Sequence, residues 1–329
     1  MNKKLFYFLA VSFFLLTPLY AQEELDDNIL YEKNTQEDNI PFEENTQEEN
    51  TLFEESIPYM PYEESEKENA AYIESLGGKF SLRLSAYISN LKFYKDYDYT
   101  EKTYTANQPL EIGFGFLYGN FGLEFRQQTS FLYDSEYKKT QTQEGQFSYY
   151  ARKAVFEIQI KDYKGFHSGS DNDIDLHLQF AGIFGQYIWN NEKFSWPAAF
   201  GLGERQLRSA GSFLLGGNIF YMMSENNLLE SYKKKHILAI PNIGYAHTWV
   251  YKSNLFLTLS PSAGIGMAHE FSGTNHSAAS LSFHGAVGYH WDDISFMISY
   301  NALIFSITLE DNSDSFVSTM LQCSVAKRF

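Results

Sequence analysis

The sequence predicts an all-β protein: a closed antiparallel transmembrane β-barrel of about twelve strands, preceded by a disordered, acidic N-terminal tail. Three observations predict this fold. Residues 76–329 alternate repeatedly between apolar and polar residues, the pattern of half-buried strands. Most alternating segments are 11 to 18 residues long, whereas soluble strands average about five or six residues and a tilted strand crosses a bilayer with about 9–11. The chain also ends in an aromatic residue, Phe329.

The first 21 residues have the pattern of a secretory signal peptide. A basic start is followed by an apolar run from Leu5 to Leu16 and by the small residue Ala21. The apolar run is too short and wrongly flanked for a spanning helix. Cys323 is the single cysteine, so the sequence offers neither a disulfide framework nor a lipidation site behind the signal peptide. We therefore expect an exported protein that is not held together by disulfides.

Residues 22–75 predict a disordered periplasmic tail. This segment is repetitive and holds 18 acidic residues against 2 lysines, which accounts for nearly all of the excess negative charge of the chain. Its composition offers little that could form a core. The rest of the chain is nearly neutral and lacks a basic stripe, so nucleic acid is not an expected partner. The tail is interpreted either as a solvated spacer or as an array of docking motifs for a periplasmic partner.

Residues 76–329 are expected to form the barrel itself. An even number of strands closes the ring and removes the free edges that lipid does not tolerate. Ten strands are the alternative, if 108–133 or 194–223 folds differently. The twelve candidate strands are roughly 80–94, 108–118, 120–133, 147–163, 173–189, 194–206, 211–223, 236–250, 253–270, 277–290, 293–308 and 316–329.

The two faces of these segments differ in polarity, most clearly in 253–270, 277–290 and 173–180. An apolar outer face and a polar inner face are typical of a barrel that has lipid outside and polar groups inside. The apolar face of 173–180 consists of Ile174, Leu176, Leu178 and Phe180, and its polar face, predicted to line the lumen, consists of Asp173, Asp175, His177 and Gln179. In 147–163, Arg152 falls on the apolar parity, so either a bulge resets the phase or Arg152 lies beyond the apolar band.

The connections between strands predict which end of the barrel faces the periplasm. With both barrel termini in the periplasm, the short periplasmic turns are 119, 164–172, 207–210, 251–252 and 291–292. The outer loops are 95–107, 134–146, 190–193, 224–235, 271–276 and 309–315. Periplasmic turns are usually shorter than outer loops, and only 164–172 and 190–193 break this trend.

The last strand is typical of bacterial outer-membrane barrels. Its apolar face ends at Phe329, and such a terminal strand is read by the barrel-insertion machinery, although Lys327 departs from the usual apolar residue. The expected partners are therefore outer-membrane lipid and this machinery. The expected location is the outer membrane of a diderm bacterium, with the tail in the periplasm.

Three stretches resemble a known family. YYARKAVFEIQIKDYKGF (149–166) and ERQLRSAGSFLLGG (204–217) resemble signature segments of the domain of unknown function 4421 family, a β-barrel-like family of exported bacterial proteins. ANQPLEIGFGFLYGNFGLEFRQ (106–127) resembles its early hairpin, and the likeness extends with gaps over about 76–329. The resemblance implies an envelope location but brings no established activity, so it assigns no catalytic residue.

Polar side chains that could gather in the lumen or at its mouth form the candidate site. Glu204, Arg205 and Arg208 precede SAGSFLLGG (209–217) and are interpreted either as a charged turn or as a cluster at the barrel mouth that narrows the lumen or docks a partner. The candidate residues are Glu204, Arg205, Arg208, Asp173, Asp175, His177 and His284. No catalytic residue, metal ligand or cofactor is predicted.

The predicted number of strands limits how wide the lumen can be and therefore which functions fit. Twelve strands lie between filled eight-stranded barrels and wide sixteen-stranded porins. We therefore expect a narrow channel or a structural envelope protein of unknown substrate. The alternatives are an outer-membrane lipid-modifying enzyme and a surface or periplasmic binding protein. Side chains of the hydrolase type are His167, Ser168, Ser170, His247, Ser277 and His284, but their spacing predicts no catalytic arrangement.

Overall fold

The computed structural model describes residues 72–76, 80–97, 100–169, 171–226, 232–308 and 313–329. The predicted signal peptide and residues 22–71 of the predicted tail lie outside this part of the chain. In the described ranges, no helical segment is long and apolar enough to cross a membrane.

Nearly all of the described residues are in strands. The short elements are β1 (Ile73–Ser75), β3 (Thr100–Thr105), β9 (Glu204–Gln206) and a one-turn π-helix, η1 (Pro197–Gly201). The long strands are β2 (Phe80–Tyr97), β4 (Glu111–Tyr118), β5 (Phe121–Gln128), β6 (Gln141–Tyr150), β7 (Ala154–Ser168), β8 (Asp171–Ile188), β10 (Ala210–Asn226), β11 (Tyr232–Tyr251), β12 (Leu255–Glu270), β13 (Asn275–Trp291), β14 (Ile294–Thr308) and β15 (Ser313–Arg328).

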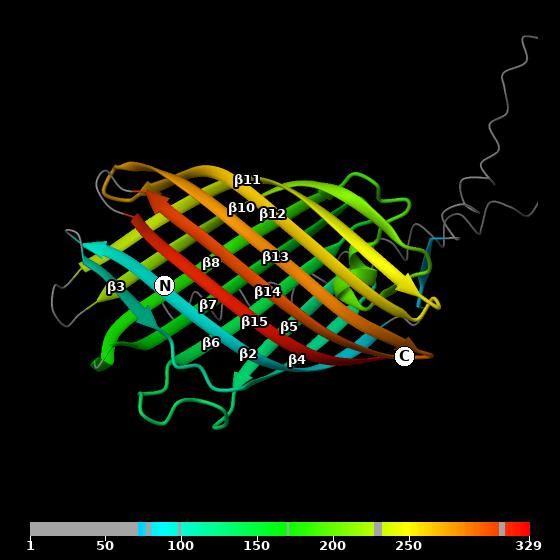
Figure 1. The fold of residues 1–329 in the computed structure, drawn as a ribbon, viewed down its shortest axis with the longest axis horizontal. Coiled ribbons are helices and arrows are strands. Elements are labelled where there is room, and N and C mark those ends of the chain that lie inside the picture. The colour runs from blue at the N-terminus through cyan, green and yellow to red at the C-terminus, as the bar shows by residue number, and fades with distance from the viewer. Residues whose placement is uncertain (1–71, 77–79, 98–99, 170, 227–231, 309–312) are drawn as a thin grey trace, which may run out of the picture. The chain divides into compact units, whose positions relative to one another are not determined.

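The twelve long strands form a closed antiparallel barrel (Figure 1). Each pairs with the next along the chain, and β15 closes the ring on β2 through residues 314–328 and 81–95. The rings of Phe80 and Phe329 stack with centroids 5.0 Å apart, so the first and last strands start and finish at the same end of the barrel. We call this the terminal end and the opposite one the loop end. The predicted closed twelve-stranded fold is confirmed.

Two of the predicted strands were nevertheless wrong, and their errors cancel in the count. The segment 147–163 contains parts of two strands, β6 and β7, joined by a turn at 151–153. The first half of β6, 141–146, is polar or glycine on both faces, so it carries no alternation that could be seen in the sequence. Arg152 lies in this turn, so it is beyond the apolar band and no bulge is needed to explain its parity.

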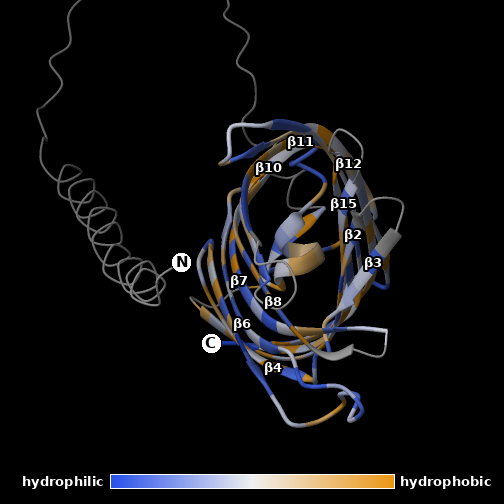
Figure 2. Ribbon diagram, turned by 90° about the vertical axis from the view of Figure 1, so that its left-hand side faces the viewer, coloured by the Kyte–Doolittle hydropathy of each residue, from blue (hydrophilic) through white to orange (hydrophobic). Residues whose placement is uncertain are grey.

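The predicted strand 194–206 is not part of the wall. It enters the lumen, where η1 and β9 form (Figure 2). Its apolar residues recur with period two and are buried, as in Phe194, Trp196 and Leu202, so the sequence resembles a strand. Pro197 lacks the N–H that a central strand needs, and it starts the helical turn instead.

As a result of these two differences, two connections lie at the opposite end of the barrel from the one predicted. The connection between β7 and β8 lies at the loop end, although 164–172 was predicted to be periplasmic. The connection from β8 to β10, at 189–209, lies at the terminal end, although 190–193 was predicted to be an outer loop. The two predicted exceptions to the length trend were therefore placed at the wrong ends.

The loop end of the barrel has fewer strands than the terminal end. β2 pairs with β4 through residues 80–87, but with β3 through residues 92–97. β3 in turn contacts β7 through the Thr105–His167 pair. Since β4, β5 and β6 stop short of this level, the ring there passes from β2 through β3 to β7 and contains ten strands. The closed barrel nevertheless has twelve strands, so the ten-stranded alternative is wrong.

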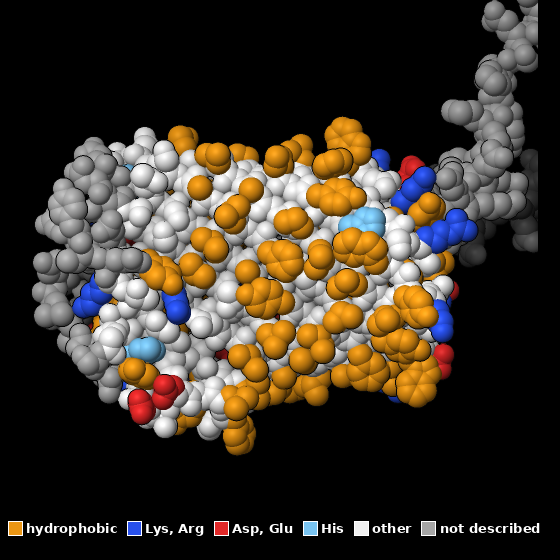
Figure 3. Space-filling view, in the orientation of Figure 1, with side chains coloured by type: hydrophobic (Ala, Val, Ile, Leu, Met, Phe, Trp, Pro, Cys, Tyr) orange, Lys and Arg blue, Asp and Glu red, His pale blue; other side chains and the backbone are white. Residues whose placement is uncertain are grey.

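The outward face of the wall is apolar over most of its length, as Figure 3 shows for one side. In β12, Leu257, Ile265 and Met267 are exposed, whereas Thr258 and Ser260 face inward and are buried. β13 has the same arrangement, so the predicted faces of 253–270 and 277–290 are confirmed. This apolar outer face and polar inner face fit a wall with lipid outside.

The predicted faces of 173–180 are reversed. Ile174, Leu176 and Leu178 point into the barrel and are buried in its largest apolar cluster. Asp175 and His177 alternate with them on the outward face. This part of β8 lies at the loop end, so we infer that its outer surface meets water and its apolar side chains turn inward, as in a soluble protein.

The apolar cluster spans the lumen near the loop end. Its aromatic side chains come from strands that are far apart in the ring, and the rings of Phe180 on β8 and Phe316 on β15 lie 4.6 Å apart. The ring centroid of Phe305 lies 4.8 Å from that of Phe316 and 5.0 Å from that of Phe220. We call Phe180, Phe220, Phe305 and Phe316 the aromatic seal.

Candidate functional site

A cavity of about 220 Å³ occupies the middle of the lumen. The aromatic seal bounds it toward the loop end. Toward the terminal end it is bounded by Trp196 and Phe200, from the connection between β8 and β10. We call residues 189–209 the plug, because this connection folds back into the ring.

The plug is fastened by buried polar contacts. The Gln206 side chain accepts from the backbone N–H of Ser195 at 3.0 Å and donates to the carbonyl oxygens of Arg208 at 3.0 Å and of Lys193. On the wall side, the Arg83 guanidinium donates to the carbonyl oxygen of Gly201 at 2.6 Å. β1 pairs with β9, which ties residues 73–75 to the plug. Residues 73–75 are therefore structured, although they belong to the segment predicted to be a disordered tail.

One wall of the cavity carries a compact charge network. Arg126 on β5 donates to Glu144 at 2.8 Å and to Glu124 at 3.2 Å, and its guanidinium lies 4.2 Å from the centre of the Tyr87 ring. Lys161 adds a second positive charge, 4.0 Å from Glu144. These charges largely satisfy one another, so this network stabilises the wall and leaves little of its charge for a ligand.

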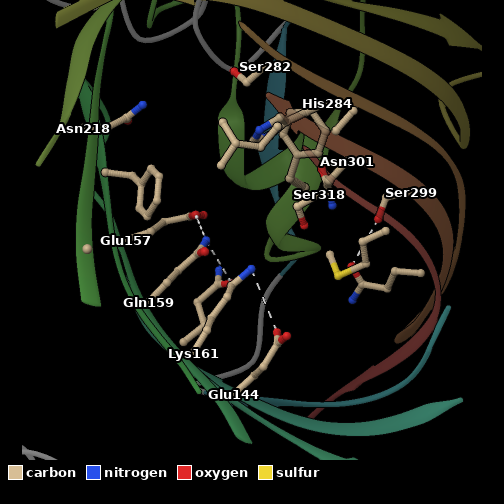
Figure 4. A pocket seen from close by; sticks show the side chains of 18 of the residues that line it. Glu144, Glu157, Gln159, Lys161, Asn218, Ser282, His284, Ser299, Asn301 and Ser318 are labelled. Carbon is tan, nitrogen blue, oxygen red and sulfur yellow. Dashed lines mark hydrogen bonds and ion pairs between the residues drawn. The ribbon is translucent and has the colours of Figure 1, made fainter. Parts of the chain in front are cut away.

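Glu157 stands apart from that network. Its side chain comes from β7 and lines the cavity (Figure 4). Its hydrogen bond comes from Gln159 at 3.4 Å, and among the described residues it makes no ion pair. A carboxylate in the lumen without a basic partner is an acceptor that a ligand can use.

The opposite wall is neutral and rich in hydroxyl and amide groups. It is formed by β12 to β15, and Figure 4 shows Ser282, His284, Asn301, Ser318 and Ser299 across the cavity from Glu157. Ser299 donates to Gln322 at 3.1 Å, and Ser262 bonds to Ser282 at 2.5 Å. The His284 ring lies against the plug, 5.9 Å from Trp196 and 5.8 Å from Phe200.

The structure does not bring the predicted site residues together. Glu204 and Arg205 lie in the plug: Glu204 accepts from Ser195, and Arg205 pairs with Glu74 of β1. Arg208 is exposed, 5.5 Å from the Tyr72 ring. Three candidates lie on β8 at the loop end: Asp173, Asp175 and His177. There His177 hydrogen-bonds to Asp162 at 2.6 Å on the outward face. Of the candidate residues whose side chains the structure describes, only His284 lines the cavity.

The side chains of the hydrolase type are also scattered. His167 stacks on Tyr137 with ring centroids 3.9 Å apart, and the rings of His247 and Trp249 lie 4.5 Å apart on the outward face. Ser277 is exposed at the loop end, and Ser170 lies outside the described ranges. No two of the described candidates hydrogen-bond to each other.

The residues that line the cavity were largely missed in the sequence. Glu144, Glu157 and Lys161 come from β6 and β7, the two strands that were read as one segment. The one available signal was the polar parity of 155–163, in which Glu157, Gln159 and Lys161 recur at period two. The side chains that share this parity line the cavity in the lumen.

A protein family matches most of the chain. The family described as "Domain of unknown function (DUF4421)" matches residues 67–323. The chain belongs to this family. The resemblance carried by 149–166, 204–217 and 106–127 is thereby confirmed, and these DUF4421 segments form the β6–β7 hairpin, the plug with the start of β10, and the β4–β5 hairpin.

Solved structures similar to this DUF4421 protein are outer-membrane proteins. OmpT of Vibrio cholerae is 9% identical, with a TM-score of 0.30 over 76% of this chain and 98% of that chain. The outer membrane protease OmpT from Escherichia coli is 7% identical, with a TM-score of 0.34 over 76% and 96%. A bacterial polysaccharide outer membrane secretin is 10% identical, with a TM-score of 0.35 over 77% and 99%. No curated protein matches the sequence.

Proposed function

We propose that this DUF4421 protein is an outer-membrane β-barrel that binds a small polar solute in a lumen closed at both ends. The membrane location is supported by the apolar outer face, together with a ring that has no free edge. The wall therefore provides every backbone hydrogen bond that lipid cannot provide.

The cavity between the aromatic seal and the plug is the observation that carries the binding proposal. A permanently open pore needs a continuous path of water, but the aromatic seal crosses the lumen on one side of the cavity and the plug covers the other. A cavity with apolar ends and a few convergent polar groups has the character of a ligand site. Binding is therefore favoured over the narrow channel expected from the strand count.

The polar groups of the cavity indicate what kind of solute would fit. Glu157 offers a carboxylate without a basic partner on one wall, and Asn301 and Ser318 offer neutral donors and acceptors on the other. Aromatic rings close the two ends. A compact solute with hydroxyl or amine donors would pair with all of these groups, whereas a second carboxylate beside Glu157 would be repelled.

Purified protein is expected to retain such a solute. Small molecules released by denaturing the wild-type protein, and identified by mass spectrometry, should include one compound at about one copy per chain. Ser318→Phe fills the cavity and should abolish retention, and Glu157→Gln should weaken it. Glu192→Gln, in the exposed part of the plug, is the matched control and should retain the compound. Equal recovery from wild type and Ser318→Phe would contradict the proposal.

We also propose that the terminal end faces the periplasm, as expected for a barrel that the insertion machinery recognises at Phe329. The acidic segment 22–71 then lies in the periplasm and leads directly into β1, so it is joined to the plug. A periplasmic partner with a cationic surface would suit its charge.

Protease accessibility checks this orientation. Protease added to intact cells should spare the tail and should cut it once the outer membrane is permeabilised. An epitope inserted in the exposed turn 271–274, at the loop end, should be reached by antibody in intact cells. Cleavage of the tail in intact cells would invert the topology.

A further inference from the structure

Three side chains of the metal-binding type meet inside the loop end, away from the cavity. They are His236 on β11, Glu270 on β12 and His276 on β13, three consecutive strands of the ring. His236 is paired in register with Glu270, and both flank the apolar cluster on the inward face. The Glu270 carboxylate lies 3.6 Å from Nε2 of His276 and 3.9 Å from Nε2 of His236.

Three of the four histidine nitrogens of this group have no hydrogen-bond partner among the described residues. His236 is 1% exposed, and neither its Nδ1 nor its Nε2 has a hydrogen bond. Nε2 of His276 is also buried without one. Buried polar atoms in folded proteins are nearly always satisfied, and an exception calls for a missing ligand or water. Here one ring nitrogen of each histidine and a carboxylate oxygen of Glu270 lie close together.

We propose that His236, Glu270 and His276 bind a divalent transition-metal ion such as Zn²⁺. Two imidazoles and one carboxylate form a ligand set that Zn²⁺ accepts, with a fourth position open to water or to another group. Ligand atoms bound at about 2.0–2.1 Å in tetrahedral geometry lie roughly 3.4 Å apart. The three ligand atoms here all lie within 4.8 Å of one another, so small side-chain rotations close the site.

The surroundings of the site add a partly exposed ligand and a further acidic side chain. Glu270 is 18% exposed, which leaves a path from the loop end. Asp314 on β15 interacts electrostatically with Glu270 and His276, and its Oδ1 is buried without a hydrogen bond. Lys95 and Lys234 also act on Asp314 and offset part of the local negative charge. A bound ion would link β11, β12 and β13 at the level where the ring narrows.

Metal titration of the purified full-length barrel tests the site. Protein stripped with a chelator should bind one Zn²⁺ per chain by calorimetry and elemental analysis. Glu270→Gln or His276→Ala should lower the affinity by at least about 10–100-fold, the loss that removal of even an outer-shell group causes. The matched control is His269→Ala, the neighbouring residue on the opposite face of β12, which bonds to Asn275 at 2.8 Å. This variant should bind as the wild type does.

Thermal unfolding provides a second readout, because an ion that binds only the folded state raises the melting temperature. Zn²⁺ should raise the melting temperature of the wild type and of His269→Ala, but not that of His276→Ala. Heat-modifiable gel migration establishes that each variant is a folded barrel. Wild-type protein that binds no Zn²⁺, or that binds it no more tightly than folded His276→Ala, would overturn the proposal.

Discussion

Replacing Arg126 with Met is expected to destabilise the folded barrel by about 3–5 kcal/mol, because removing one member of a buried charge network leaves its partners uncompensated. The side chains of Arg126 and Glu144 are only 7% and 5% exposed. Without the guanidinium, Glu124 and Glu144 remain close to each other in the lumen wall. Equilibrium urea unfolding in lipid vesicles, followed by the fluorescence of the four tryptophans, measures the change.

The control for Arg126→Met is Lys233→Met. Lys233 lies 2.8 Å from Glu225, but its side chain is 48% exposed, so its pair contributes at most about 1 kcal/mol. Adding Glu124→Gln and Glu144→Gln to Arg126→Met should recover much of the loss, since the carboxylates no longer need a counter-charge. A cost below about 1 kcal/mol for Arg126→Met would mean that water screens the network and that the lumen is wetter than its burial indicates.

Opening both closures of the lumen should convert a non-conducting barrel into a conducting one. Apolar constrictions stop ions because water leaves them, and polar substitutions let water back. Phe180→Ser with Phe316→Ser should therefore wet the aromatic seal, and replacing residues 191–207 by a short Gly/Ser linker should remove the plug. In planar bilayers, each change alone should leave conductance near the wild-type baseline. The combination should produce stepwise ion currents.

Two outcomes would contradict this closure arrangement. Steady currents through the wild-type protein would show that the seal and plug do not close the lumen. Absence of current from the folded combined variant would place a further barrier elsewhere. The matched control is Ile183→Ser with Leu321→Ser, which substitutes exposed, outward-facing residues of the same two strands, β8 and β15. It should leave the lumen closed.

The candidate site could be predicted only in part, and the reason is visible in single strands. In β13, the polar parity that includes Ser282 and His284 lines the cavity, as alternation predicts. In β6, residues 141–146 are polar or glycine on both faces, so neither a strand nor its inward residue Glu144 could be recognised. The proposed metal ligands could not be recognised in the sequence for a different reason. His236 is 34 positions from Glu270, and only the register of β11 against β12 makes them neighbours.

Period-two alternation, strand length and the aromatic terminus by themselves determined a closed antiparallel barrel, because a wall between lipid and a polar lumen imposes that pattern on most strands that cross it. The predicted number of twelve strands was correct only because two errors cancelled. Only the tertiary structure decided which face of a segment points inward where lipid ends. It turned Leu176 and Leu178 inward and drew Phe194, Trp196 and Leu202 into the lumen as a plug. The physical reason is that alternation records a difference between two environments. It does not record which environment is lipid, which is water and which is the interior.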